Sequence, residues 1–333
     1  MPPERAMMYA MSDPHSDPRV ELATFPTPVE PAPRLATAIG LGPDDLWIKR
    51  DDLTGLGGGG NKIRKLEWTV GAALAEGADT LVTTGAPQSN HARLTAAAGA
   101  RLGLAVVLVL RGSPGVSRSG NLALDGLFGA RIAWAGEVDQ AGLDRAAAEV
   151  CEELRGGGAR PALIPFGGSS ALGARGYAHC GEELRRQLPD LRTAVVALGS
   201  GGTMAGLVIS LGVEAVLGVD VGALTEPATA VSEFAGLATP EGLRVRRDQV
   251  GAGYATLTAP TAEALTLAAR TAGLVLDPTY TGRAMAGLIA AVRDGDIRPG
   301  ERTVFVHTGG LPGLFGHAEG VAYAEGQVVE YRA

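Results

Sequence analysis

The sequence lacks three features that would each indicate a particular class of protein. Cys151 and Cys180 are the only cysteines in 333 residues, which argues against a disulfide framework and favours a reducing, cytoplasmic compartment. The formal net charge is −7 and no lysine and arginine block is present, so the charge predicts binding neither to nucleic acid nor to a membrane surface. No apolar stretch is long enough to span a membrane, and residues 1–18 lack the apolar core of a signal peptide. Small-molecule chemistry is the function that these absences favour.

Lysine is also scarce. Lys49, Lys62 and Lys65 are the only lysines, whereas the chain has 26 arginines. Coding bias and chance could produce this distribution. A lysine amine, however, forms a Schiff base with a carbonyl compound, and a guanidinium group does not. The short segment that contains the lysines is therefore the first candidate for covalent chemistry.

Length and hydrophobic pattern predict a globular α/β protein. The composition is 46% hydrophobic and 20% charged, and the length exceeds the size at which one core usually divides into two domains. Short apolar runs alternate with helix-length stretches, which predicts parallel sheets with helices on both faces. The predicted strands are residues 80–83, 105–110, 131–135, 162–166, 194–198, 215–221 and 303–307.

The same pattern suggests a domain organisation. We expect residues 1–18 to be a loose N-terminal tail and residues 60–168 to form a smaller α/β domain. That domain would be inserted into a larger one made of residues 19–59 and 169–333. Ligands of open α/β sheets bind beyond the carboxyl ends of the strands, so chemistry is expected in the loops that follow the strands.

The first such feature is a run of four glycines, residues 57–60, just before Lys62. Ile63, Leu66 and Val70 then recur at helical spacing, which predicts a helix that begins near Lys62 and holds its amine beside the glycine loop. Nucleoside triphosphatases also place glycines and a lysine before a helix, but Ser or Thr follows their lysine. Ile63 follows here. A glycine loop with a surface lysine remains an alternative on these residues alone.

The second feature is a polar cluster after the strand that ends near residue 83. Gln88, Ser89, Asn90 and His91 stand where a helix is expected to begin. Ser and Asn are ordinary helix caps, and His91 alone is a weak signal. Together, the four side chains at a positive helix end would suit an anion such as a substrate carboxylate.

The third feature is a glycine turn between a predicted strand and a helix. Backbone N–H groups in such a turn, together with the helix end, form a phosphate site. A dinucleotide site is the rival, since Asp220 lies at a suitable spacing, but Met204 stands where its motif requires a third glycine. The turn comprises Gly199, Ser200, Gly201, Gly202 and Thr203.

In combination, the motifs resemble those of the D-cysteine desulfhydrase and 1-aminocyclopropane-1-carboxylate (ACC) deaminase family. The resemblance extends from about residue 19 to residue 315 and includes the segment at residues 167–173. It implies the two-domain pyridoxal-phosphate fold of type II, similar to the tryptophan synthase β-subunit. It also implies pyridoxal 5′-phosphate as cofactor, a small amino-acid substrate, no metal and a homodimer.

The resemblance further implies roles for individual residues. Lys62 binds the cofactor as a Schiff base and is catalytic with Ser89, Tyr254 and Tyr280. The substrate is expected to contact Ser89, Asn90, His91 and Thr308. The other residues expected to bind the cofactor are Lys65, Asn90, Gly199, Ser200, Gly201, Gly202, Thr203 and Thr281.

Three positions distinguish the two branches of this family. ACC deaminases have Gln, Glu and Leu where this chain has His91, Thr281 and Thr308, and all three residues match the desulfhydrases. The family places residue 281 at the pyridine nitrogen, where a carboxylate favours ring opening of a cyclopropane and a hydroxyl suffices for loss of a thiolate. The prediction is D-cysteine desulfhydrase, which releases sulfide, pyruvate and ammonia. L-cysteate sulfo-lyase or another cysteine-like C–S lyase, ACC deaminase and an inactive cofactor-binding regulator are the alternatives.

Overall fold

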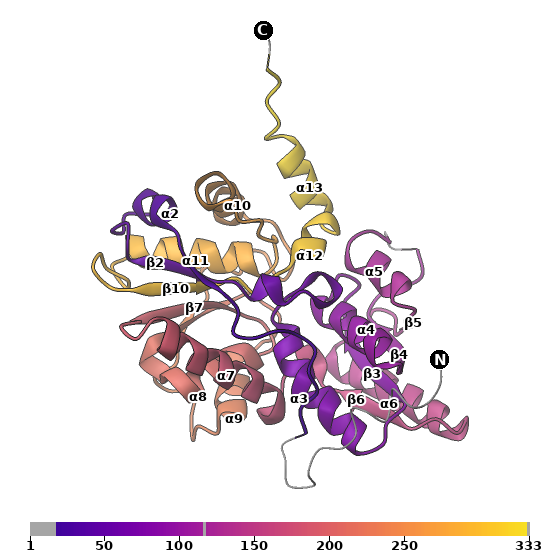
Figure 1. Ribbon diagram of the computed structural model, residues 1–333. Coiled ribbons are helices and arrows are strands. Elements are labelled where there is room, and N and C mark those ends of the chain that lie inside the picture. Colours follow the sequence, from indigo (N-terminus) through magenta and orange to yellow (C-terminus); the bar gives the residue numbers. More distant parts are fainter. Residues whose placement is uncertain (1–17, 116–117, 332–333) are drawn as a thin grey trace.

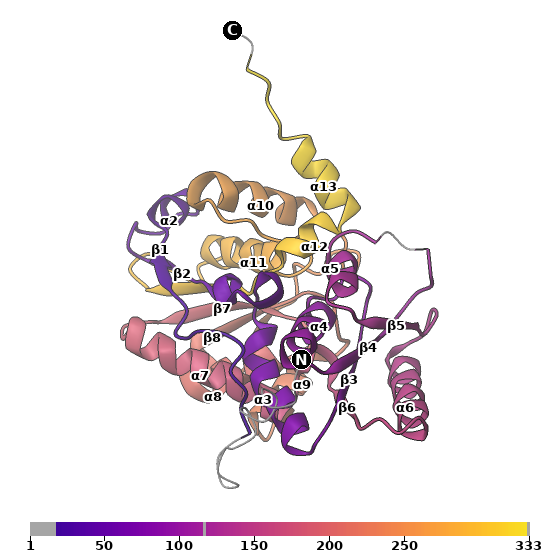
Figure 2. The same ribbon diagram turned by 45° about the vertical axis from the view of Figure 1, so that its right-hand side comes forward.

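The structure is a computed structural model that describes residues 18–115 and 118–331 (Figure 1). The expected N-terminal tail lies outside the described residues except for Pro18. The described chain forms two β-sheets, one of four strands and one of six, with helices packed on their faces (Figure 2). None of its helices combines the length and apolar character needed to cross a membrane.

The smaller sheet has strand order β5-β4-β3-β6, and all its strands are parallel. Leu81 and Leu108 pack on one face with residues of α3 and α4, while Val82 and Val107 pack on the other with α6. Helices therefore cover both faces, as the alternating pattern predicted. The elements of this region are α3 (Lys62–Ala75), β3 (Thr80–Gly85), α4 (Asn90–Leu102), β4 (Ala105–Leu110), α5 (Asn121–Leu127), β5 (Arg131–Trp134), α6 (Gln140–Gly156) and β6 (Pro161–Ile164).

The larger sheet has strand order β1-β2-β10-β7-β8-β9 and is parallel except for β1. One face packs against α2, α10 and α11, and the other against α7, α8 and α9 (Figure 2). Its strands are β1 (Val29–Pro31), β2 (Leu46–Lys49), β7 (Thr193–Leu198), β8 (Val216–Asp220), β9 (Arg244–Arg246) and β10 (Thr303–Val306). Its helices are α2 (Pro33–Ala38), α7 (Ala171–Gln187), α8 (Gly202–Leu211), α9 (Pro227–Ala235), α10 (Ala259–Ala272) and α11 (Thr281–Arg293).

Short elements complete the described chain. The helices α12 (Leu311–Phe315) and α13 (Ala318–Glu325) follow β10. In Figure 1, α13 lies at the edge of the molecule, and its Tyr323 hydroxyl lies 2.8 Å from Thr266 Oγ1 of α10. Four 3₁₀ turns lie between other elements: η1 (Asp51–Thr54), η2 (Leu56–Gly58), η3 (Phe166–Gly168) and η4 (Val213–Ala215).

The sequence prediction of an α/β fold with two parallel-rich sheets is confirmed. All seven predicted strands are present, with ends shifted by at most two residues. The strands β1, β2 and β9 were not predicted; β1 and β9 have three residues each, too few to show a period. Strands of the smaller sheet lie within residues 80–164, but Val20 also packs in the core beneath that sheet. The domain boundaries proposed from the sequence stay a prediction.

Helix α3 connects the two halves of the molecule. Ile63 and Leu66 pack in the core of the smaller sheet, while Arg64 faces α7 of the larger one. A Cβ atom on Gly176 of α7 would lie 2.1 Å from the carbonyl oxygen of Arg64, so only glycine allows these helices to approach so closely. The first turn of α3 is thereby fixed between the two sheets.

Candidate active site

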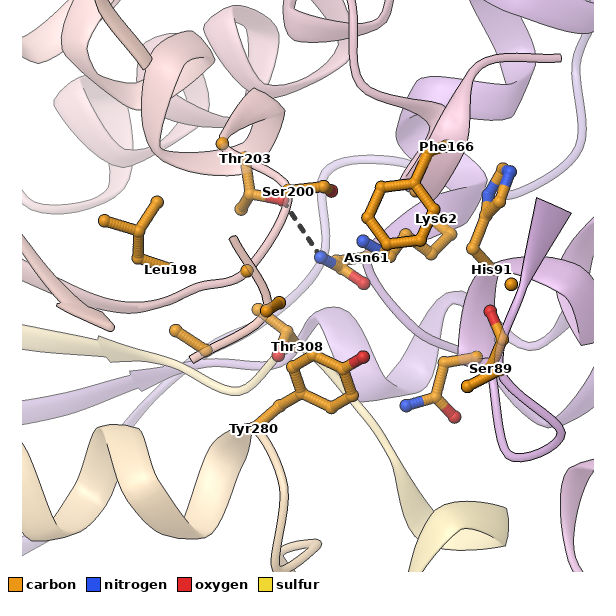
Figure 3. A pocket seen from close by; sticks show the side chains of 18 of the residues that line it. Asn61, Lys62, Ser89, His91, Phe166, Leu198, Ser200, Thr203, Tyr280 and Thr308 are labelled. Atoms are coloured by element: carbon orange, nitrogen blue, oxygen red, sulfur yellow. Dashed lines mark hydrogen bonds between the residues drawn. The ribbon is translucent and has the colours of Figure 1, made fainter. Parts of the chain in front are cut away.

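A pocket lies between the two sheets, at the carboxyl ends of their strands. The loops after β3, β4 and β6 supply one side, and the loops after β7, β8 and β10 supply the other. Figure 3 shows the Lys62 side chain close to Asn61, Phe166 and His91. The sequence-predicted residues that line this pocket are Lys62, Lys65, Ser89, Asn90, His91, Gly199, Ser200, Gly201, Thr203, Tyr254, Tyr280 and Thr308.

Lys62 is the first residue of α3, at the position that the sequence predicted. Its amine faces the pocket, and burial lowers its pKa to about 8 although a hydrogen bond with Lys65 acts in the opposite direction. The preceding Asn61 donates a 3.0 Å hydrogen bond from Nδ2 to Thr203 Oγ1 across the pocket (Figure 3). A fraction of Lys62 is therefore neutral near pH 7, which is the form that attacks a carbonyl carbon.

Lys65 lies one helical turn after Lys62 and is buried. Its Nζ donates to Ser169 Oγ at 3.0 Å and lies 3.4 Å from the carbonyl oxygen of Gly167. Burial, and then the charge of Lys62, hold the pKa of Lys65 well below its usual value. An anion bound beside these two amines would raise the pKa of each, because it would favour their charged forms.

The glycine turn before α8 is built for such an anion. Gly201 has a φ of +89°, and as the N-cap of α8 it offers no side chain of its own to the first turn. Ser169 Oγ accepts from the backbone N–H of Gly202 at 3.2 Å and lies 2.7 Å from Ser200 Oγ. Backbone N–H groups, hydroxyls and a nearby lysine amine together form a suitable set of donors for a phosphate. Gly202 itself is not among the residues that line the pocket.

The polar cluster after β3 lies at the start of α4, as predicted. Ser89 is the N-cap, and its Oγ accepts from the backbone N–H of Ala92 at 3.1 Å. The Asn90 Oδ1 atom accepts from Asn121 Nδ2 at 3.0 Å. Ser89 therefore is an ordinary helix cap, and its hydroxyl hydrogen remains available for a ligand in the pocket.

His91 is buried and neutral. The Thr83 hydroxyl donates to the carbonyl oxygen of Ile164 at 2.9 Å, so we infer that it accepts from Nε2 of His91 at 2.8 Å. Nδ1 of His91 then has no hydrogen and no partner among the described residues. Burial, followed by the charges of Lys62 and Lys65, lowers the pKa of His91 well below its usual value. His91 can thus accept a hydrogen bond through Nδ1.

Two tyrosines meet on the opposite side of the pocket. The hydroxyls of Tyr254 and Tyr280 are 2.5 Å apart, and their rings are edge to face with centroids 6.1 Å apart. Burial raises the pKa of Tyr280 well above its usual value. It also raises the pKa of Tyr254, although 38% of this residue is exposed, so solvent reduces the effect there. Both phenols are neutral hydrogen-bond donors near pH 7.

Thr281 does not line the pocket. It is fully buried, its Oγ1 lies 2.7 Å from Asp277 Oδ1, and it accepts from the backbone N–H of Asp277 at 2.8 Å. Thr308 does line the pocket, and its carbonyl oxygen accepts from the backbone N–H of Asn61. The contact between Thr281 and the pyridine nitrogen stays a prediction. For this contact, the Thr281 hydroxyl would have to share one of its two hydrogen bonds with Asp277 between that residue and the nitrogen.

Sequence reasoning missed several side chains of the pocket, among them a cation and an aromatic ring. Arg111 follows β4 and Phe166 follows β6, and both line the cavity. Both strands were predicted, so the rule that ligands bind after strand ends could have indicated both residues. Among the described residues, no group of three or more histidines, cysteines, aspartates and glutamates is placed to hold a metal ion.

Comparisons with known proteins agree with this geometry. Residues 20–309 match the family model described as pyridoxal-phosphate dependent enzyme. A protein of Pyrococcus abyssi named "Putative 1-aminocyclopropane-1-carboxylate deaminase" is 41% identical over 91% of this chain and 94% of its own. A D-cysteine desulfhydrase of Salmonella paratyphi B is 39% identical over 90% of this chain and 96% of its own.

Solved structures show the same fold. A crystal structure described as that of an ACC deaminase homologue has a TM-score of 0.82 and 37% sequence identity, and covers 92% of this chain and 96% of its own. Threonine deaminase isoform 2 of Solanum lycopersicum has a TM-score of 0.63, covering 91% of this chain and 84% of its own. At 19% identity, this second likeness concerns the fold alone.

Proposed function

The chain belongs to the ACC deaminase and D-cysteine desulfhydrase family of pyridoxal-phosphate-dependent enzymes, and we propose that it catalyses β-elimination from D-cysteine. The products are sulfide, pyruvate and ammonia. The proposal rests on one observation: no aspartate or glutamate is among the described residues that line the pocket. Elimination of a good leaving group needs less electron withdrawal by the cofactor than ring opening of ACC, so it does not require a carboxylate at the pyridine nitrogen.

The pocket fits the family's cofactor. We propose that Lys62 binds its carbonyl carbon and that the turn before α8, with Ser169 and Lys65, holds its phosphate. Three features of the chain support this assignment: the lowered pKa of Lys62, the glycine N-cap of α8 and the absence of a carboxylate from the described pocket lining. When bound, pyridoxal phosphate withdraws electrons from the substrate's α-carbon and makes its hydrogen acidic.

The remaining steps fall to residues of the chain. In this proposal, the N-terminus of α4 with Ser89 and Asn90 orients the substrate carboxylate. The Lys62 amine, with a pKa of about 8 before the cofactor binds, is suited to accept the α-proton. The Tyr280 hydroxyl, held by Tyr254, donates a hydrogen bond toward the departing sulfur. The carbon–sulfur bond breaks with its electron pair on sulfur, and water then hydrolyses the enamine to pyruvate and ammonia.

A panel of substrates tests the proposal. Purified holoenzyme is assayed with D-cysteine, L-cysteine, L-cysteate, β-chloro-D-alanine and ACC, and the values of kcat/KM are compared. We expect D-cysteine to release sulfide and pyruvate and ACC to give little 2-oxobutanoate. The double variant Thr281→Glu, Thr308→Leu should lose roughly tenfold or more on D-cysteine, because a new carboxylate changes the protonation of the ring. Efficient turnover of ACC without release of sulfide would overturn the proposal.

L-Cysteate is the second candidate substrate. Arg111, a cation that lines the pocket, favours it because a sulfonate is anionic at every physiological pH. Activity on cysteate alone would keep the β-elimination chemistry and change the leaving group from sulfide to sulfite.

A further inference from the structure

Arg111 is a pocket residue without a role in the elimination proposed for D-cysteine. It follows β4 directly, on the four-stranded sheet, and it lines the pocket between the sheets. The cations that line the pocket among the described residues are Lys62, Lys65 and Arg111. The first two lie toward the cofactor and phosphate positions, which leaves the third for another anion.

The position of Arg111 is fixed on several sides. Its backbone N–H donates to the carbonyl oxygen of Gly85 at 3.0 Å. The next residue, Gly112, exchanges hydrogen bonds of 2.9 and 3.1 Å with Gly136. Its guanidinium Nη2 donates to Gln140 Oε1 at 3.0 Å, and Gln140 Nε2 donates in turn to Asp144 Oδ1 at 2.8 Å. Such a side chain binds an anion with little loss of conformational entropy.

The charge of Arg111 is not neutralised. Its direct partner, Gln140, is neutral, and no carboxylate of the described residues forms an ion pair with it. Its Nε is buried and has no hydrogen-bond partner in the described chain. Buried polar atoms are nearly always paired, and an unpaired one indicates a missing ligand, water or ion. A guanidinium with a free Nε–H binds planar or tetrahedral oxyanions through several hydrogen bonds.

Arg111 lies on the substrate side of the pocket. Gly85, to which it is bonded, begins the loop that leads to Ser89 and Asn90 at the start of α4. Tyr254 lies within electrostatic reach, since the charge of Arg111 acts to lower the pKa of that hydroxyl against the larger effect of burial. The proposed phosphate turn belongs to the other sheet, between β7 and α8. Arg111 therefore lies on the same sheet as Ser89 and Asn90, beside the loop that we assign to the substrate.

We propose that Arg111 binds an anionic group on the β-carbon of the amino-acid substrate, such as a sulfonate or a phosphate ester. This inference rests on the proposed β-elimination and narrows its substrate class. As the Cα–H proton passes to a base, the Cβ–X bond breaks and its electron pair leaves with X. An X that is already charged gains one further negative charge as it departs with the electron pair, and a guanidinium at this position stabilises that charge.

Pairs of substrates that differ in the charge of X test this inference. Cysteate and O-phosphoserine carry an anionic X, while β-chloroalanine and O-acetylserine carry a neutral one, and both enantiomers of each are assayed. In Arg111→Gln holoenzyme, we expect kcat/KM to fall roughly 100-fold for the anionic pair and less than about threefold for the neutral pair. Arg111→Lys should lose roughly tenfold on the anionic pair, because it keeps the charge without the planar fork.

Controls separate this role from a general loss of structure. Arg131→Gln removes an exposed charge at the other end of the adjacent strand β5 and should leave all values unchanged. Both Arg111 variants should keep the cofactor absorbance of the wild type. Equal losses on all four compounds would overturn the inference and place Arg111 on the α-carboxylate or in a structural role.

A binding measurement keeps the inference independent of turnover. Titration of the holoenzyme with cysteate and with β-chloroalanine, followed by its visible absorbance, gives a Kd for each compound. We expect the wild type to bind cysteate at least about tenfold more tightly than Arg111→Gln does. If no compound is turned over but this difference in Kd is found, the proposed elimination fails and the anion site stands. Equal Kd values for the two proteins would overturn the anion site.

Discussion

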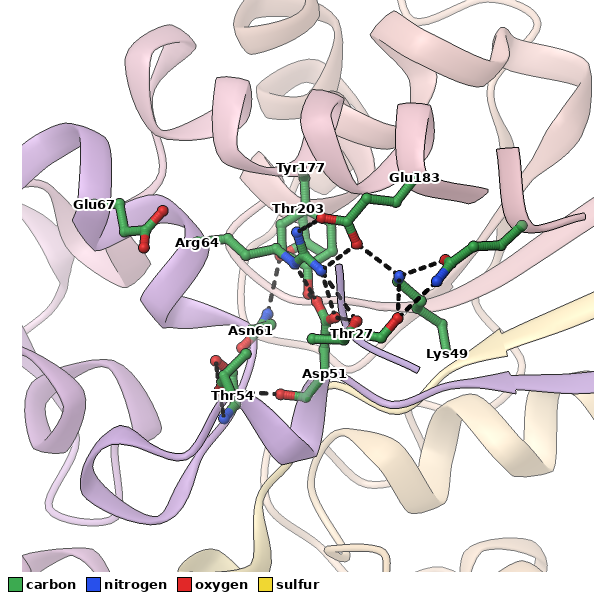
Figure 4. Close-up of polar contacts among 12 residues, drawn as sticks. Thr27, Lys49, Asp51, Thr54, Asn61, Arg64, Glu67, Tyr177, Glu183 and Thr203 are labelled. Atoms are coloured by element: carbon green, nitrogen blue, oxygen red, sulfur yellow. Dashed lines mark hydrogen bonds and ion pairs between the residues drawn. The ribbon is translucent and has the colours of Figure 1, made fainter. Parts of the chain in front are cut away.

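The three lysines of this chain are close in sequence but lie in two opposite environments. Lys49 is enclosed in an ionic network, with its Nζ 2.6 Å from Glu183 Oε2, 2.9 Å from the carbonyl oxygen of Thr27 and 2.8 Å from Gln187 Oε1 (Figure 4). Lys62 and Lys65 face the pocket, where no carboxylate lies among the described lining residues. Lys49 thus has a carboxylate partner, whereas burial without one lowers the pKa of Lys62 and Lys65 and favours their neutral, nucleophilic form.

The network around Lys49 also supports the pocket. Arg64 lies two residues after Lys62 on α3 and donates to both Asp51 and Glu183, with distances of 2.8 to 2.9 Å. Asp51 belongs to η1 and Glu183 to α7, so these ion pairs join the first turn of α3 to the larger sheet. Burial opposes ionisation of Asp51, but the Arg64 guanidinium outweighs it and lowers the pKa of the carboxyl group. Paired charges thus hold the helix from which the unpaired amine extends.

The largest expected effect comes from removing the unpaired amine that we assign to the cofactor. Lys62→Ala should lose the visible absorbance of the bound cofactor and the adduct trapped by borohydride, and its activity should fall by roughly 10⁴-fold. Lys49→Ala and Lys65→Ala should keep a covalent linkage, since neither amine is assigned to the cofactor carbon. A peptide map of reduced wild type locates the pyridoxyl group. A pyridoxyl group on Lys49 would contradict the comparison of the two environments, because the reactive amine would then belong to the ionic network and not to the pocket.

Much of this arrangement follows from local sequence patterns. The glycine run, the helical spacing after Lys62 and the polar residues before α4 are contiguous in sequence, and their positions in the fold were predicted. The network of Asp51, Arg64 and Glu183 was not predicted, because its members come from segments far apart in the chain. Nothing in the periodicity of α7 indicates that Glu183 faces inward to meet two cations. Long-range pairing of this kind is determined by the packing of α3 on α7.

Other expectations remain untested by the geometry. A homodimer, a cytoplasmic location, the domain boundaries and the roles of individual site residues stay predictions. Thr281 shows why the roles of site residues do not follow from residue types alone. The sequence identifies its residue type, but the hydrogen bonds with Asp277 depend on how the loop before α11 folds back on itself. A residue type in a motif therefore predicts a position along the chain better than it predicts the partner of a hydroxyl group.

The second prediction concerns the stability of the paired region. Asp51→Asn leaves the buried Arg64 without a close carboxylate on one side, which should lower the free energy of unfolding by about 3–5 kcal/mol. Asp79→Asn breaks the exposed pair with Arg160 and should lower the free energy of unfolding far less, because solvent screens this pair. Urea unfolding of each holoenzyme measures both values. Similar losses for the two variants would show that burial does not increase the contribution of these ion pairs to the free energy of unfolding.

The pH dependence of unfolding sharpens the same prediction. The pKa of Asp51 is lower in the folded state than its ordinary value, so its charge stabilises the fold above about pH 4. Protonation removes this stabilisation as the pH falls below that value. The wild type should therefore lose stability more steeply than Asp51→Asn as the pH falls below about 4, so that the two curves approach each other. Parallel curves over this range would contradict the assignment.

Arg283 shares features with both the ionic network around Lys49 and the pocket around Lys62. It is fully buried on α11, yet its guanidinium donates to backbone carbonyl oxygens rather than to carboxylates. Nη1 donates to Val221, and Nη2 donates to Gly253 and Thr256, all at 2.7 Å. The last two carbonyls flank Tyr254, and α11 begins one residue after Tyr280. Arg283 is thus a positioning residue that holds one tyrosine of the pair at a fixed distance from the other.

The smallest expected effect comes from replacing this cation by a shorter one. A lysine cannot reach all three carbonyls, so Arg283→Lys should let the Tyr254 loop move and lower kcat roughly tenfold, with KM changed less than about threefold. Cofactor absorbance should stay normal, because Lys62 is untouched. Arg293→Lys, an exposed change on the same helix, is the matched control. A purely structural role would lower the unfolding free energy without changing kcat, and that result would refute the positioning role. A loss confined to kcat would show that Arg283 positions the Tyr254 loop for catalysis. A buried cation bonded to carbonyl oxygens would then have this role without the carboxylate partners found around Lys49.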